Sequence, residues 1–579
     1  MSDRTPAPVP ADGGLAARAG RAGETGGPAE TSPNEVGSPV APRSEEPMII
    51  QGGMGVGVSG WPLASAVSRA GQLGVVSGTA IEVVHARRLA DGDLGGHLRR
   101  AYASFPVPGV AERVIERYFR PSGRSAGESY DKVEKFTLRP SRGLQELTVL
   151  SSYAEVWLAR EGHGGPVGVN LLQKIQLPTV HTLYGAMLAG VAAVLMGAGV
   201  PSAIPALLRG LASGERVGYS IDVERPAEVQ DPVAAELVFD PTELFSGAEV
   251  PGVPSFYAIV ASHTLATFLG RDPVTRPDGF VVEGPTAGGH NAPPRRSKER
   301  DERGQPVYGP RDVVDLEVVA AQGLPFWMAG GYGTPQGLVT ALSEGAQGIQ
   351  VGSAFACCEE SGMAPELRDQ IRQHAAEGTL SVLTDVRASP TGFPFKLVEL
   401  EGSLSEGSVR ARRERVCNLG YLRVAFTDTE GNIGYRCAAE PVANYLRKGG
   451  DPADTEGRVC LCNGLLATAD YPQLWHGEPE PPVVTGGDAM ADVVRALSPD
   501  GVPYHAADVI EHLLSGLDGP RLPASDSAVG LAATEPARSV DRAASANADT
   551  ARVTTQDPSA RRDGEVLVAG SSSDAGPTL

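Results

Sequence analysis

The chain has 579 residues, a net charge of −20 and a pI near 5.0, so a nucleic acid or an anionic membrane surface would repel it. Six cysteines are too few for a disulfide framework and fit a reducing compartment. No apolar run reaches the roughly 20 residues of a membrane span, and we expect no secretory signal because no apolar segment follows the first arginines. We therefore expect a soluble cytoplasmic protein with no nucleic-acid or membrane partner.

Both ends of the chain have the composition of disordered tails. Residues 1–46 are rich in Pro, Gly, Ala, Glu and Ser, and residues 516–579 in Ala, Ser, Asp, Thr and Arg; neither segment contains an aromatic residue. Such segments bury too little apolar surface to offset the entropy of ordering, about 1–2 kcal/mol per residue. We predict that both tails are disordered.

Between the tails, short apolar runs alternate with amphipathic segments. The predicted strands lie at 48–50, 73–76, 167–170, 191–195, 256–260, 279–282, 326–329 and 348–351. The predicted helices include 63–70, 152–160, 204–211, 265–269, 313–321 and 335–344. Continuous apolar runs are typical of parallel strands that are buried on both faces. Eight such strands, each followed by a helix, predict an α/β fold, a (β/α)8 TIM barrel over residues 47–395. A doubly wound open sheet is the alternative.

Two connections are much longer than ordinary barrel loops. They span about 91–148 and 214–254, and long insertions of this kind usually form lids or subunit contacts. Residues 113–119 have helical spacing, which predicts helices over the barrel mouth. Residues 396–515 are too many for one closing helix, so we predict an appended segment that caps the barrel.

Glycine-rich loops follow the last two predicted strands. Gly330 and Gly331 come directly after the seventh strand, and Gly352 and Ser353 directly after the eighth. Glycine lets backbone N–H groups converge on an anion, and TIM barrels commonly bind phosphate between these two loops. The two loops together predict a phosphate site.

Polar and glycine residues also follow the first, third and sixth strands. A glycine-rich loop of residues 51–57 would let a flat ligand lie against backbone, and Asn170 could donate its amide to a ring carbonyl or nitrogen. After the sixth strand, the segment 283–291 ends in Gly-Gly-His-Asn. An imidazole at a strand's C-terminal end can move a proton in the physiological range, so His290 is the candidate catalytic residue.

Together these segments resemble the nitronate monooxygenase family, formerly called 2-nitropropane dioxygenases, of FMN-dependent TIM-barrel oxidoreductases. The resembling segments are QGGMGVGVSG from Gln51, VGVN ending at Asn170, VVEGPTAGGHN around His290, MAGGYGTPQG from Met328 and IQVGSAF from Ile349. His290 matches the family's active-site histidine. That residue is implicated as the base for nitroalkanes and would mainly hold the anionic nitro group of nitronates.

The resemblance also implies which residues bind FMN. The phosphate would be bound by Gly330, Gly331, Gly352 and Ser353; the isoalloxazine ring by Gln51, Gly52, Gly53, Met54 and Asn170; the ribityl side by Glu283, Gly284 and Gly289. His263, after the fifth strand, stands where some relatives carry a lysine near the flavin.

The resemblance implies oxidation of alkyl nitronates or nitroalkanes with O2 to a carbonyl product and nitrite. An NAD(P)H-dependent flavin reductase of the enoyl-acyl-carrier-protein reductase type, which shares the GGH segment and phosphate loops, is the alternative. A non-catalytic barrel scaffold is the alternative of another class. The physiological small-molecule substrate and the oligomeric state, a homodimer included, stay open.

Four of the six cysteines, Cys417, Cys437, Cys460 and Cys462, fall in the appended segment. Their spacing fits neither a C-x2-C pair nor the common ferredoxin patterns. We therefore predict no metal and interpret the four residues as buried thiols, which behave as small apolar side chains.

Overall fold

The computed structural model of the chain describes residues 46–224, 235–295, 297–428 and 430–517. The two predicted tails lie almost entirely outside these residues and stay predictions. Within the described ranges, no helix is long and apolar enough to cross a membrane.

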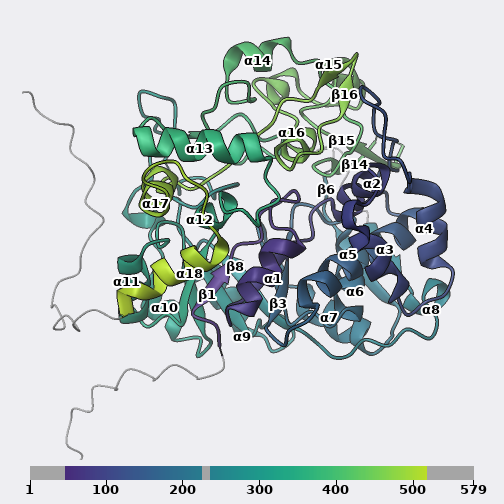
Figure 1. Cartoon of the computed structure of the whole chain (residues 1–579), viewed down its shortest axis with the longest axis horizontal. Coiled ribbons are helices and arrows are strands. Elements are labelled where there is room, and N and C mark those ends of the chain that lie inside the picture. The colour runs from purple at the N-terminus through teal and green to yellow at the C-terminus, as the bar shows by residue number, and fades with distance from the viewer. Residues whose placement is uncertain (1–45, 225–234, 296, 429, 518–579) are drawn as a thin grey trace, which may run out of the picture. The chain divides into compact units, whose positions relative to one another are not determined.

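Eight parallel strands form the central sheet of the chain (Figure 1). They are β1 (Ile49–Gln51), β2 (Gly74–Ser77), β3 (Val167–Leu172), β4 (Ala193–Gly197), β8 (Ser255–Val260), β9 (Gly279–Glu283), β10 (Phe326–Ala329) and β11 (Gly348–Val351). The sheet closes because β1 pairs with β11 and also with the residue before β2: Gln51 N donates to Leu73 O at 2.9 Å, and Leu73 N to Ile49 O at 3.1 Å. The predicted barrel is confirmed, and the open sheet is excluded.

The barrel interior is a separate apolar cluster that includes Ile50, Val75, Leu195, Val281 and Trp327. Trp327 is fully buried, and its indole N–H donates to Pro47 O at 2.8 Å. A filled interior of this kind leaves space for a ligand only at an end of the barrel.

Helices cover the outside of the barrel. Those between barrel strands include α1 (Trp61–Arg69), α2 (Ile81–Ala90), α5 (Arg142–Arg160), α6 (Thr179–Leu188), α7 (Ile204–Ala212), α9 (His263–Arg271), α10 (Leu316–Ala320) and α11 (Pro335–Ser343). The helix after β11, α12 (Ser353–Ala356), is a single turn. The later helix α18 (Ala506–Leu514) packs against both α1 and α11, so it occupies the place of the missing outer helix.

The first insertion forms α3 (His97–Ala103) and α4 (Val110–Tyr118), which pack on α5. The reason is the apolar stripe of α4, where Val110, Val114 and Tyr118 are buried. The second insertion contains the antiparallel pair β5 (Val217–Ile221) and β7 (Ala235–Phe239), whose side chains alternate between buried and exposed. It also contains β6 (Val223–Glu224) and α8 (Pro241–Leu244).

The residues after α12 form short helices and strands outside the barrel. They are α13 (Pro365–Glu377), β12 (Val382–Asp385), β13 (Phe395–Val398), α14 (Gly407–Arg412), β14 (Val424–Thr427), β15 (Ile433–Arg436), α15 (Val442–Arg447), α16 (Leu461–Thr468), β16 (Leu474–Trp475), β17 (Glu478–Pro479) and α17 (Met490–Leu497). In Figure 1, α14, α15 and α16 lie together at the top of the view. The fold joins these elements to the barrel: β14 pairs with β6, and α17 packs on α12 and α13.

His181 on α6 gives the fold an acid-sensitive point. Burial lowers the pKa of His181 to about 3, below the ordinary value of 6.5. The folded state therefore binds fewer protons than the unfolded state, so this stability is present above pH 6.5 and is lost as the pH falls toward 3. We expect a loss of about 1.4 kcal/mol per pH unit from this group in that window.

Denaturant unfolding of the wild type and of a His181→Asn variant between pH 6.5 and 4.5 checks this expectation. The variant should show the shallower fall in unfolding free energy. A His476→Asn control, at a side chain that is 86% exposed, should keep the wild-type slope. Equal slopes for wild type and His181→Asn would disprove the assignment.

Candidate functional site

A cavity of about 270 Å³ lies where the barrel strands end. Its wall contains the last residues of four strands or the residues next to them: Gly52 after β1, Glu283 ending β9, Ala329 ending β10 and Val351 ending β11. The sheet register places these ends level, since Ala329 pairs with Glu283 and Gln350, and Val351 pairs with Gln51. This volume is close to the lower end of small-molecule sites, roughly 300–1,000 Å³.

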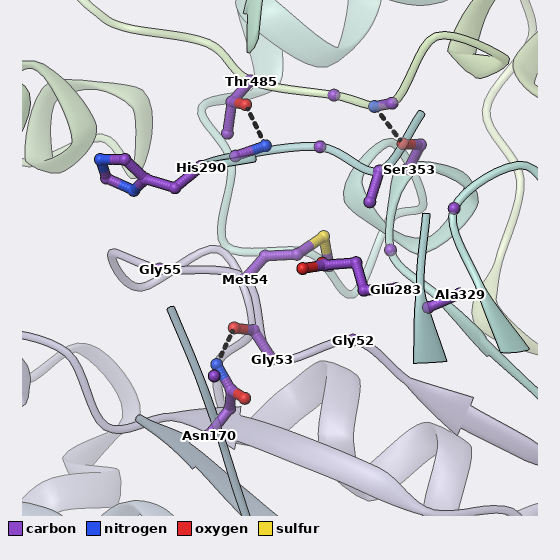
Figure 2. Close-up of a pocket in the computed structure, with 18 of the residues that line it drawn as sticks. Gly52, Gly53, Met54, Gly55, Asn170, Glu283, His290, Ala329, Ser353 and Thr485 are labelled. Carbon is purple, nitrogen blue, oxygen red and sulfur yellow. Dashed lines mark hydrogen bonds between the residues drawn. The ribbon is translucent and has the colours of Figure 1, made fainter. Parts of the chain in front are cut away.

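The loop after β1 is packed tightly against β3 (Figure 2). Asn170 Nδ2 donates to Gly53 O at 3.1 Å. A Cβ on Gly53 would lie 2.2 Å from the Asn170 Cβ, so only glycine fits there. Asn170 therefore holds the loop in place and, with Gly52, Gly53 and Met54, forms one wall of the cavity.

The loops after β10 and β11 form a second wall. Gly330 and Gly331 have φ values of +81° and +88°, the left-handed region that favours glycine. Ser353 Oγ accepts a hydrogen bond from Gly487 N at 2.9 Å, which ties the loop after β11 to the segment before α17 (Figure 2). Gln350, also in the wall, has a buried Oε1 with no hydrogen-bond partner among the described residues.

Glu283 is the acidic side chain at the end of β9. Burial raises the pKa of Glu283 to about 7, against the opposing effect of the Lys174 ammonium. Burial lowers the pKa of Lys174 to about 8. Its ammonium lies 3.3 Å from the centre of the Phe393 ring. The carboxyl group and the amine therefore both titrate near neutral pH at this site.

His290 lies at one side of the cavity, and its position is fixed from several directions. Its backbone pairs with Phe395 in an antiparallel bridge, and its Nε2 lies 2.7 Å from Ser389 Oγ. Figure 2 shows the ring extending away from the Met54 and Glu283 side chains. Burial, with a smaller effect of Lys174, lowers the pKa of His290 to about 3. The imidazole is neutral at pH 7 and is a weak proton acceptor.

Three residues from the sequence-based prediction lie elsewhere. Gln51 is fully buried beneath its loop, where Nε2 donates to Ser59 Oγ at 2.8 Å and Oε1 accepts from Val75 N at 2.9 Å, so it does not line the cavity. Gly284 lines a separate small pocket next to Asn291 and Arg295. His263 begins α9, and its Nδ1 accepts from Asp315 N at 3.2 Å, outside the cavity wall.

The other predicted residues line the cavity together: Gly52, Gly53, Met54, Asn170, Glu283, Gly289, His290, Gly330, Gly331, Gly352 and Ser353. The sequence predicted a C-terminal segment that caps the barrel but named none of the cavity residues that this segment supplies, which include Tyr421, Leu422, Leu461, Leu465, Thr485, Gly486, Gly487, Met490 and Val493. Thr485 Oγ1 accepts from Gly289 N at 2.9 Å, and Asp488 N donates to Thr286 O at 3.0 Å. A Gly-Gly pair at 486–487 was the one signal in the sequence that could have pointed to this segment.

Known proteins match part of the chain in sequence. The family model for nitronate monooxygenase matches residues 256–394, from β8 to the residue before β13. The chain is 34% identical to the nitronate monooxygenase of Pseudomonas aeruginosa over 121 residues, which are 21% of this chain and 32% of that relative. The predicted family resemblance is therefore confirmed. A probable nitronate monooxygenase of Bacillus subtilis is 35% identical over 94 residues, 16% of this chain and 25% of the relative.

The matched segments span about a third or less of these curated relatives. A solved structure, FabK from Thermotoga maritima, is similar at 15% identity with a TM-score of 0.41, over 83% of this chain and 96% of that one. The nitroalkane oxidase of Streptomyces ansochromogenes has a TM-score of 0.40 at 15% identity, over 82% and 96% of the two chains.

Proposed function

We propose that the chain is an FMN-dependent oxidoreductase of the nitronate monooxygenase type. The observation that carries the proposal is the glycine-lined cavity at the strand ends, within and beside the segment that matches the family. The residues fit a flavin because glycines leave backbone exposed on three loops and because the buried Gln350 Oε1 lacks a partner.

The loops after β10 and β11 would hold the phosphate through the backbone of Gly330, Gly331, Gly352 and Ser353. Gly52, Gly53 and Met54 would lie against the ring, and Glu283 and Gly289 beside the ribityl chain. When bound, the flavin supplies electron acceptance from substrate and the reaction of its reduced form with O2. The chain's own side chains bind and orient the substrate and exclude water.

Alkyl nitronates, already ionised, are the substrates that suit this site best. A neutral nitroalkane must lose an α-proton, and His290 with a pKa of about 3 is a poor base for that step. A neutral imidazole can instead donate a hydrogen bond to the anionic nitro group. The products would be a carbonyl compound and nitrite.

Anaerobic mixing of the flavin-loaded protein with an alkyl nitronate, the parent nitroalkane or NADH tests the proposal. We expect the nitronate to bleach the flavin and the nitroalkane to act more slowly. If NADH bleaches the flavin and the nitronate does not, the monooxygenase assignment is wrong and a reductase is favoured.

The apolar part of the cavity wall favours that second candidate. Leu172, Ile175, Leu461, Leu465 and Val493 line the same cavity, which is a larger apolar surface than a short nitroalkane needs. An NAD(P)H-dependent flavin reductase that takes an apolar acyl chain would use this surface. Steady-state oxidation of NADPH with and without an enoyl thioester separates the two functions.

Glu283 should set the pH dependence of nitronate oxidation. Its carboxyl group is neutral below its pKa of about 7 and becomes anionic above it, where it opposes an anionic substrate. We expect kcat/KM for nitronate to fall as the pH rises through 7. In a Glu283→Gln variant, whose amide cannot ionise, this fall near pH 7 should be lost.

The matched control is Glu317→Gln on the exposed face of α10, which should keep the wild-type profile. An unchanged profile in Glu283→Gln would remove Glu283 from this role.

A further inference from the structure

The four cysteines of the C-terminal segment lie around one small cavity, although the sequence separates them by up to 45 residues. Cys417 follows α14, Cys437 follows β15, Cys460 precedes α16, and Cys462 is in its first turn. Cys417 and Cys437 are close enough to affect each other's ionisation, as are Cys460 and Cys462. All four are free thiols, so the structure has no disulfide there.

Positive charges surround these four thiols. Lys135, Arg415 and Arg423 interact electrostatically with Cys417 or Cys437. Their cationic groups donate to backbone carbonyls: Lys135 Nζ to Cys417 O at 2.6 Å, Arg415 to Thr455 O at 2.6 Å and Arg423 to Phe136 O at 2.5 Å. Among the described residues, none of the three forms an ion pair with a carboxylate. All three side chains are half-buried, and their positive charges would favour thiolates over neutral thiols at these cysteines.

Hydrogen-bond donors also point at the sulfur atoms. The backbone N–H groups of Ala439, Asn463 and Leu422 favour the thiolate forms of Cys437, Cys460 and Cys462, respectively. Asn463 Nδ2 lies 3.5 Å from Cys460 Sγ as well. Donors to sulfur stabilise thiolates and are typical of metal-bound cysteines.

We propose that Cys417, Cys437, Cys460 and Cys462 form a four-thiolate metal site. A donor set of four sulfurs selects a zinc ion or an iron–sulfur cluster. Either centre would carry the net negative charge of its thiolates next to Lys135, Arg415 and Arg423. This assignment reverses the expectation from sequence spacing, because folding unites cysteines from three separate segments.

The thiols must move slightly to bind. Among the residues that the structure describes, no group of three or more His, Cys, Asp or Glu side chains is arranged so that it could hold a metal ion. The free space between the thiols is about 10 Å³. Rotation about χ1, one torsion per cysteine, is the adjustment we expect on binding.

The site adjoins the larger cavity. Leu422, Leu461 and Cys462 line both spaces. A metal centre would therefore fix the part of the wall that α16 contributes. The proposal concerns the four cysteines alone and does not depend on the redox function proposed above.

Metal analysis of the full-length protein, isolated without oxygen and without chelating agents, tests the site. We expect about one zinc, or about four iron with a matching amount of acid-labile sulfide, per chain. Zinc would identify a single-ion site, and iron with sulfide would identify an iron–sulfur cluster. Cys437→Ser and Cys460→Ser should each lower the bound metal on the order of tenfold. Cys358→Ser, at a buried thiol outside the cluster that bonds Phe355 O, should keep it.

The wild-type protein decides the question even where a serine variant fails to fold. Wild-type protein that contains neither metal, and that takes up neither zinc nor iron with sulfide on reconstitution, would refute the site. Equal metal content in the wild type and in folded Cys437→Ser and Cys460→Ser would refute it too, because the metal would then be bound elsewhere.

Discussion

A Gly331→Asp variant should purify in folded form but without flavin. Gly331 lies in the loop after β10 with φ +88°, and a Cβ there would lie 3.4 Å from Thr286 Oγ1, at the cavity wall. A carboxylate at this position would face the phosphate that we place between the two loops. Because like charges in contact cost several kcal/mol, we expect FMN affinity to fall roughly 10²–10³-fold. Titration of the flavin-free protein with FMN, followed by fluorescence quenching, measures the loss.

Two controls separate charge from backbone strain in this experiment. Gly331→Asn adds a side chain of the same size without the charge, so it should retain much more of the FMN affinity than Gly331→Asp. Gly345→Asp adds the same charge at another positive φ, +84°, in open space after α11, and should bind FMN as the wild type does. If Gly331→Asp binds FMN as tightly as Gly331→Asn, the phosphate is not held there.

A His290→Ala variant should keep its flavin and lose activity toward nitronates. The imidazole is neutral and lies at the cavity edge, so we assign it one hydrogen bond to the anionic substrate. Hydrogen bonds to charged groups contribute about 1.5–3 kcal/mol, which corresponds to a fall of roughly 10–100-fold in kcat/KM. Steady-state oxygen consumption with an alkyl nitronate measures the change, and His290→Gln, which keeps an N–H donor, should restore part of it.

The other histidine at a strand end supplies the matched control. His263→Ala should leave kcat/KM for nitronate unchanged, because His263 lies outside the cavity wall. We also expect that His290 contributes no step near pH 6.5 to the pH profile, so the wild type and His290→Ala should not differ by such a step. Such a step would mean that His290 titrates normally and acts as a base, contrary to this assignment.

The barrel could be predicted from the sequence because its strands are local apolar runs with glycine-rich ends. All eight predicted strands appear as barrel strands, and the loops at Gly52, Gly330 and Gly352 line one cavity as expected. The Gln51 side chain does not line the cavity as predicted. Its amide is hydrogen-bonded to Ser59 and Val75 beneath the loop, and a motif does not reveal such buried partners.

The rest of the site depends on contacts between segments that are far apart in sequence. Thr485 reaches Gly289 across 196 residues, and Gly487 reaches Ser353 across 134. No periodicity or spacing reports such contacts. The same holds for the four cysteines, whose separate positions in the chain predict no shared cavity. The packing of the helices of the first insertion also depends on such a contact, because the apolar stripe of α4 packs on α5.

The visible absorption spectrum of the purified full-length protein, with quantification of the released cofactor, tests the central claim most directly. We predict a flavin spectrum and close to one FMN per chain, either as purified or after addition of FMN. Protein that is colourless and takes up no FMN would contradict the account, since the cavity at the strand ends would then not be a flavin site.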